Sequence, residues 1–212
     1  MPLDFDTTYR PDEIADLDDA KVVTSIQWDG VVYELRNHLD GWVFLTWSKT
    51  PTATVHPLMT EGEHALHLAV AETVLEAATT RIQWDNHNQA AVAASSDGTR
   101  WATTWIQAGH PHHSEHEDWD SAHLTLADRL DEMAEGPVYT GNNIEDEIAK
   151  AHLHRAAADI RSAVALAKLG DVMRDAQPHL QKERQVTAIA SRLGVERKFL
   201  YRVFTGEEWR RR

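Results

Sequence analysis

The sequence predicts an α+β protein in which an antiparallel sheet with helices on one face is followed by an all-α C-terminal domain. Three observations support this fold class. β-Branched and aromatic residues separated by Asp-Gly turns occupy much of the region between residues 21 and 110. Segments with apolar residues at helical spacing follow those strands. Beyond about residue 143, only helical patterns remain.

The first half begins with an aspartate-rich stretch, residues 1–20, that predicts a loose N-terminal arm or one short helix around Asp12 to Asp19. The strand pattern starts at Lys21 and contains tight turns at Asp29-Gly30 and Asp40-Gly41. After a loop with Pro51 and Pro57, a helix is predicted to cover one face of the sheet. Its apolar positions are Leu66, Ala69, Val70, Thr73, Val74 and Ala77.

The arrangement then repeats, because Ile82-Gln83-Trp84-Asp85 has the same letters as Ile26-Gln27-Trp28-Asp29. Further strands, a turn at Asp97-Gly98 and a histidine-rich loop lead to a second helix, DWDSAHLTLADRLDEMAE. We therefore predict two β-β-β-α units, residues 21–79 and 80–136, that share one sheet of about six strands.

Glycine, proline and asparagine mark a linker at residues 137–143, and the all-α domain is predicted to span residues 144–212. Its first helix runs from Ile144 to Leu169, where Gly170 is expected to end it. A further helix is predicted from Asp171 to Ala176, and the last two helices of the domain follow it.

Charge is distributed unevenly along the chain, whose net charge is −13. Residues 1–150 hold 27 acidic and 8 basic residues, a balance of −19, whereas residues 151–212 hold 7 and 13, a balance of +6. The C-terminal domain therefore suits a polyanionic partner better than the acidic front domain does. Because the chain has no cysteine, no signal-peptide pattern and no long apolar run, we expect a cytoplasmic protein without membrane contact.

The segment Val186–Val203, VTAIASRLGVERKFLYRV, has the spacing A-x3-G-x5-L. Ala190 suits the closest approach of two helices, Gly194 allows the left-handed turn between them, and Leu200 closes the core from the second helix. Over about residues 184–206, this pattern resembles the helix-turn-helix family of DNA-binding proteins.

The resemblance implies that a helix from about Glu196 to Phe204 enters the major groove of double-stranded DNA. The side chains then expected to face base edges are Glu196, Arg197, Lys198, Tyr201 and Arg202. Those expected at the phosphate backbone are Lys182, Arg184, Thr187, Ser191 and Arg192, with Arg210 to Arg212 as an arm. The alternative is a helical hairpin for protein contact. Since most members of the family bind as dimers, a homodimer through the helix from Ile144 to Leu169 is also expected.

Two other groups of residues are candidate sites. His110, His112, His113 and His116 are weak candidates for a metal site, but a solvated turn is the favoured interpretation. A structural role is favoured over an aromatic ligand pocket or a partner surface for Trp28, Trp42, Trp47, Trp84, Trp101 and Trp105. The sequence contains no phosphate-binding glycine loop and no nucleophile motif, so we expect no enzyme activity and no cofactor.

These observations predict a sequence-specific DNA-binding protein, a transcriptional regulator whose acidic domain binds a ligand or a protein partner or forms a dimer. One alternative is a phage or mobile-element inhibitor or adaptor, in which the acidic domain binds a basic protein surface and the C-terminal motif autoregulates. Another is an accessory factor in recombination or plasmid maintenance.

Overall fold

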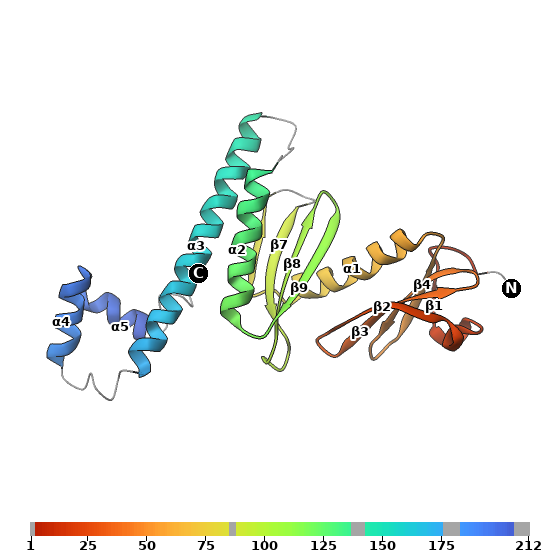
Figure 1. The fold of residues 1–212 in the computed structure, drawn as a ribbon, viewed down its shortest axis with the longest axis horizontal. Helices are drawn as coiled ribbons and strands as arrows, with labels where there is room; N and C mark the ends of the chain where they lie inside the picture. Colours follow the sequence, from red (N-terminus) through yellow and green to blue (C-terminus); the bar gives the residue numbers. More distant parts are fainter. Residues whose placement is uncertain (1–2, 85–87, 137–142, 176–182, 206–212) are drawn as a thin grey trace. The chain divides into compact units, whose positions relative to one another are not determined.

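The computed structural model describes residues 3–84, 88–136, 143–175 and 183–205 (Figure 1). Helices and antiparallel strands are both abundant, so the predicted α+β class is confirmed. The chain folds into two compact units, residues 1–122 and 123–212. The boundary between them precedes the predicted linker, of which residues 137–142 lie outside the described residues.

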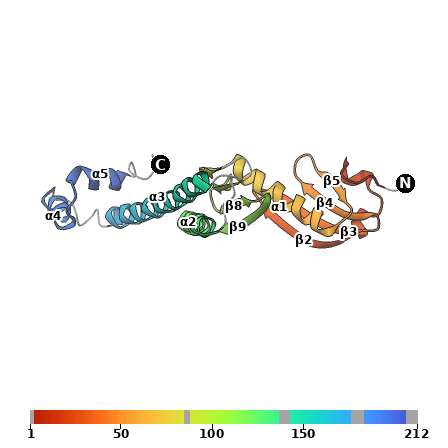
Figure 2. The same ribbon diagram turned by 90° about the horizontal axis from the view of Figure 1, so that it is seen from above.

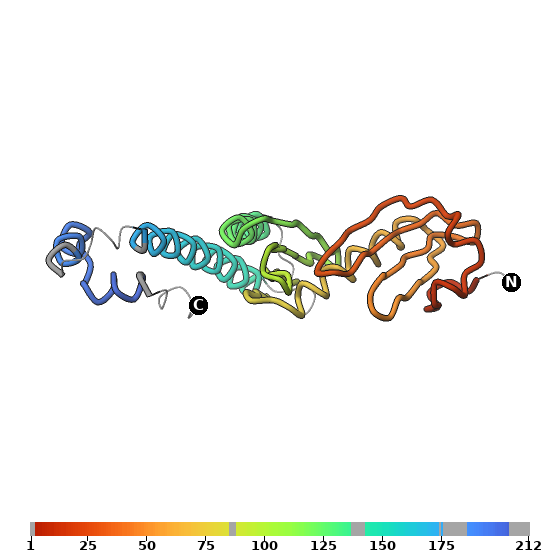
Figure 3. The backbone as a smooth tube through the Cα atoms, turned by 90° about the horizontal axis from the view of Figure 1, so that it is seen from below, coloured from red at the N-terminus to blue at the C-terminus, as the bar shows by residue number. Residues whose placement is uncertain are grey.

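The first unit contains two sheets, and the prediction of one sheet of about six strands is wrong. The strand order is β1-β5-β4-β3-β2 in the first sheet and β6-β7-β8-β9 in the second. Apart from β1, consecutive strands are neighbours, so each sheet is an up-and-down meander (Figure 3). The strands are β1 Thr8–Tyr9, β2 Lys21–Trp28, β3 Val31–His38, β4 Gly41–Trp47, β5 Thr52–His56, β6 Thr80–Gln83, β7 Gln89–Ala94, β8 Trp101–Gln107 and β9 His110–His116.

From Lys21 onward, the described residues form four strands before each of the first two α-helices, not the predicted three, and β1 precedes them in the first sheet. The additional strands are β5 and β9, both in segments predicted to be loops. Pro51 and Pro57 lie just outside β5, where a missing amide donor does not interrupt the strand ladder. The histidine-rich β9 pairs with β8 along its whole length, from Gln107 opposite His110 to Trp101 opposite His116.

Helix α1, Met59–Glu76, packs against both sheets and so unites the first unit (Figures 1 and 2). One core cluster joins its Leu66, Val70 and Val74 to Trp28 of β2 and Ala93 of β7. Near its start, a Cβ atom on Gly62 would lie 2.6 Å from Leu35 Cδ1, so the glycine lets α1 approach β3 closely. The apolar residues on α1 thus serve two sheets, not the single sheet face that was predicted.

The N-terminal arm is packed against the first sheet, which corrects the prediction of a loose arm. Ile14 and Leu17 are buried against Val43 and Val55. Arg36 Nη1 also donates a hydrogen bond of 3.1 Å to the Leu17 carbonyl oxygen. The arm contains two 3-10 helices, Pro11–Glu13 and Leu17–Asp19. The sequence had predicted one short helix here as the alternative to a loose arm.

The second unit consists of helices. Helix α2, Trp119–Glu135, begins in the first unit and is followed by α3, Asn143–Asp175, α4, Glu183–Leu193, and α5, Arg197–Thr205. The predicted break at Gly170 and the separate helix from Asp171 are wrong, because α3 continues through both (Figure 2). A mid-helix glycine costs only about 1 kcal/mol relative to alanine, and the burial of Met173 one turn later offsets that cost.

Within the described residues, no helix combines the length and the apolar character that crossing a bilayer requires.

We expect Leu66→Ala to lower the free energy of unfolding by about 2–5 kcal/mol, because Leu66 is fully buried in the cluster between the sheets. Leu39→Ala is the matched control, since the Leu39 side chain is 93% exposed. Urea denaturation of both variants checks this expectation. Similar losses in the two would contradict the central position of α1.

Candidate nucleic-acid interface

The connection between α4 and α5 is a tight turn centred on Gly194. Gly194 has φ +65°, the left-handed conformation that glycine adopts without steric cost. The Val195 amide donates to the Ala190 carbonyl at 3.0 Å, and the Gly194 amide donates to the Ser191 carbonyl at 3.3 Å. These two bonds make the Schellman pattern of helix termination. The predicted geometry of this turn is confirmed.

A small apolar core fixes α4 and α5 to the end of α3. Val186 and Ala190 from α4, Leu200 from α5 and Met173 from α3 are all buried in one cluster. Leu169, Ile189, Val195 and Phe199 pack at its edge. The two helices of the motif therefore form a three-helix arrangement with the last turns of α3. The sequence predicted a separate helix from Asp171 to Ala176 at this place, whereas the structure has the last turns of the continuous α3.

The structure brings together the five side chains predicted to face base edges. Glu196 stands immediately before α5, and its carbonyl accepts the Phe199 amide at 2.9 Å. The others lie on α5 as two neighbouring pairs one turn apart, on the surface opposite the buried Leu200. All five are exposed: Glu196, Arg197, Lys198, Tyr201 and Arg202.

One contact orders this surface, since the Arg197 guanidinium lies 5.7 Å from the centre of the Tyr201 ring. Such a cation–π contact keeps the arginine charge while limiting its rotamers. The α5 surface thus offers cationic and aromatic groups on a rigid helix, and a B-form major groove is wide enough to admit a helix.

The side chains predicted to face the phosphate backbone are only partly described. Thr187, Ser191 and Arg192 are exposed on α4. Arg184 belongs to α4, but its side chain is not among the described parts of the chain. Lys182 and Arg210 to Arg212 lie outside the described residues.

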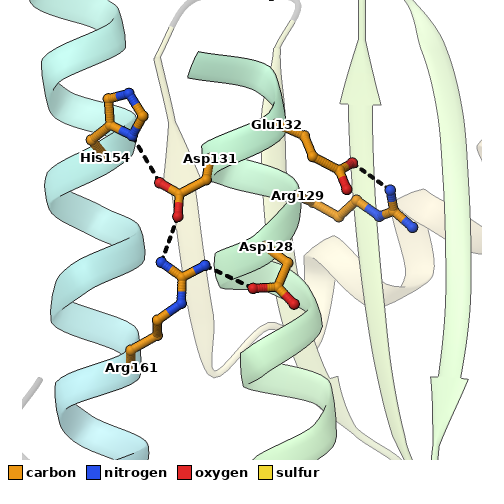
Figure 4. Close-up of polar contacts among 6 residues, drawn as sticks. All are labelled: Asp128, Arg129, Asp131, Glu132, His154 and Arg161. Atoms are coloured by element: carbon orange, nitrogen blue, oxygen red, sulfur yellow. Dashed lines mark hydrogen bonds and ion pairs between the residues drawn. The ribbon is translucent and has the colours of Figure 1, made fainter. Parts of the chain in front are cut away.

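A polar network joins α2 to α3, the helix that carries the motif (Figure 4). Arg161 of α3 hydrogen-bonds to Asp128 and Asp131 of α2, and His154 Nδ1 lies 2.8 Å from the second carboxylate. Burial alone would raise the pKa of Asp131, but the hydrogen bonds from His154 and Arg161 outweigh it and lower that pKa. No local pattern in the sequence signals this network, because its partners are 23 to 33 residues apart.

The four histidines considered as metal ligands lie on β9, and they contact different neighbours. His112 stacks on Trp105 with 5.1 Å between ring centres, whereas His116 Nε2 lies 3.2 Å from Thr103 Oγ1. His110 lies beside His64, and His113 meets the edge of Trp28 in the interior. In the part of the chain that the structure describes, no group of three His, Asp or Glu side chains is placed to hold a metal ion. The predicted solvated turn is replaced by a strand.

Among the tryptophans, a structural role is confirmed for Trp28, which is fully buried between the sheets. Trp47 is half-buried, and its Nε1 donates to Glu34 at 3.0 Å. Trp84 is the exception to the predicted strand positions, because it follows the end of β6.

Comparisons of this chain with protein-family models, curated proteins and solved structures gave no match.

We expect Gly194→Val to destabilise the α4–α5 turn by about 1–2 kcal/mol, since a β-branched residue resists the left-handed conformation. A Cβ atom on Gly194 would meet no other atom within 4 Å, so backbone strain is the only penalty. Gly194→Asn is the matched control, because asparagine tolerates this conformation. Hydrogen exchange of the α4 and α5 amides measures the effect, and equal losses for both variants would contradict it.

The free energy of unfolding should fall as the pH drops below about 6.5, the ordinary histidine pKa. Burial lowers the pKa of His113, and nearby Glu115 opposes that shift only partly. The unfolded chain therefore takes up a proton in a range where the folded chain does not, which favours unfolding.

The measurement is urea unfolding between about pH 7.5 and pH 5.5, a range that spans the ordinary pKa. His113→Gln should make the pH dependence of the free energy of unfolding shallower, because glutamine takes up no proton in this range. If the free energy of unfolding of His113→Gln depends on pH as steeply as that of the unmodified chain, the buried His113 ring is not the source of the pH dependence.

Proposed function

We propose that the chain is a sequence-specific DNA-binding protein, a transcriptional regulator that reads the major groove with α5 and acts as a homodimer. The observation that carries the proposal is the exposed surface of Arg197, Lys198, Tyr201 and Arg202 on a helix fixed by the Gly194 turn. Arginine and lysine there can donate to the O6 and N7 acceptors of guanine. Glu196, just before α5, can accept a hydrogen bond from a cytosine amine.

Charge supports the same function. Between His179 and Phe204 the chain has six basic residues and two acidic ones, although the whole chain is acidic. Phosphate contacts depend on such local charge, so binding should weaken as salt rises. The acidic front half would be repelled by DNA and is left to bind a ligand or a protein partner.

The charge of −19 over residues 1–150 also favours a second candidate function. In it, the front half binds a basic protein surface as an inhibitor or adaptor, and α5 serves autoregulation. The two functions can be distinguished in cells that express a variant whose α5 no longer binds DNA. If this variant loses every effect that the unmodified protein has on the cell, the regulator is favoured. If it retains an effect, the inhibitor or adaptor is favoured.

We expect Arg197→Ala to weaken binding to the preferred duplex by about 1–3 kcal/mol and to relax the preference at one base position. Lys198→Ala should also weaken binding. Selection from a random duplex library identifies the site, and fluorescence anisotropy at several salt concentrations measures affinity.

Arg81→Ala is the matched control, because this arginine lies on β6 in the acidic front unit, where it donates to Gln89. Its affinity should equal that of the unmodified chain. No selected sequence, or no loss in either α5 variant, would overturn the proposed function.

A further inference from the structure

Helix α3 carries a row of exposed apolar residues along its length. Every seventh residue of α3, from its first turn to its last, is apolar and exposed: Ile144, Ala151, Ala158, Ala165 and Val172. The larger members are highly exposed, Ile144 by 71% and Val172 by 65%, and Ile148 beside the row is 63% exposed. We call these six residues the α3 stripe.

A different face of α3 is already covered. Leu153, Ala157, Ile160 and Val164 are buried on that face. Arg161 and His154 hold α3 to α2 through Asp131 (Figure 4). The α3 stripe is thus an additional apolar surface, and its side chains are exposed.

We propose that the α3 stripe binds the α3 stripe of a second copy of this chain, with the two helices antiparallel and crossing at Ala158. A strict seven-residue repeat keeps one seam facing a partner helix when two helices supercoil. The stripe extends over four heptads, from residue 144 to residue 172, or about 42 Å of helix. The row supplies one apolar position per heptad, and its small central residues allow close contact between two helices.

Side-chain size fits a second copy in this orientation. The seven-residue row within the stripe, Ile144 to Val172, is symmetric about Ala158, with alanines at its centre and larger residues at both ends. An antiparallel copy sets Ile144 beside the partner's Val172 and Ala151 beside the partner's Ala165. The central alanines allow the backbones to approach closely, and the larger residues fill the space at the ends.

The helix dipoles and one charge pair favour the antiparallel orientation over the parallel one. Glu147 flanks the stripe at the start of α3 and Lys168 flanks it near the end, whereas Glu145 lies opposite the partner's Asp171. In the antiparallel pair, Glu147 lies near the partner's Lys168. A parallel pair would bring Glu147 against its own copy and align both helix dipoles, and both effects are unfavourable.

This inference rests on the homodimer in the proposed function and names the surface that forms it. It does not depend on DNA contact, because self-association is measured without DNA. A dimer without DNA binding would refute the DNA-binding function alone. DNA binding by a monomer would refute only the α3 pairing.

The chain contains no cysteine, so single cysteines report the pairing cleanly. Ala158→Cys should give a covalent dimer on mild oxidation, since the crossing brings residue 158 next to its own copy, within the Cα separation that a disulfide tolerates. Ala151→Cys should not, because its neighbour is the partner's Ala165. His152→Cys, an exposed position away from the stripe, is the control and should stay monomeric on denaturing gels.

The double variant A151C/A165C should cross-link, which confirms the register. Covalent dimers of both single variants, A151C and A158C, would indicate a parallel pair and overturn the antiparallel proposal. Absence of cross-linking in A158C and A151C/A165C would overturn the pairing itself.

Light scattering of the full chain gives an independent test. The unmodified chain should have the mass of a dimer, and Ala158→Glu should shift it to a monomer, because two carboxylates cannot be buried at the crossing point. His152→Glu adds the same charge outside the stripe and should remain a dimer. A monomeric unmodified chain, or a dimeric Ala158→Glu whose circular dichroism shows an intact fold, would contradict the proposal.

Discussion

The continuity of α3 through Gly170 is the constraint on which the second unit depends. One helix of 33 residues binds α2 through the Arg161 network, supplies Met173 to the core beneath α4 and α5, and presents the exposed stripe. A break at Gly170 would separate these roles. Because the helix is unbroken, the α4–α5 pair is fixed to the same rigid element that contacts α2.

Elements determined by local residues were predictable from the sequence. The strands beside Asp29-Gly30 and the Gly194 turn follow from residues that adopt positive φ at little cost. Alternating side chains such as Tyr33 and Leu35 similarly marked β3. The exposed α5 residues were predicted because the positions of Ala190, Gly194 and Leu200 determine which residues must face inward.

Elements determined by distant contacts were not predictable. β9 contains four histidines and a proline and has no apolar alternation, so only its pairing with β8 makes it a strand. Two sheets replace one because α1 has apolar residues for both, with Leu66 in one core cluster and Leu75 in another. In the sequence, these residues have the same spacing as a helix that covers one sheet.

The proposed function depends on the charge of the α5 surface and on the rigid attachment of α5 to α3. The basic α5 surface lies within residues 151–212, which have a balance of +6, and the acidic first unit has its own core around α1. Hydrogen exchange with and without the selected DNA duplex is the decisive measurement for DNA recognition by α5. We expect DNA to protect the amides of α5 and to leave those of β2 to β9 unchanged. Protection confined to the first unit, with none in α5, would contradict this function.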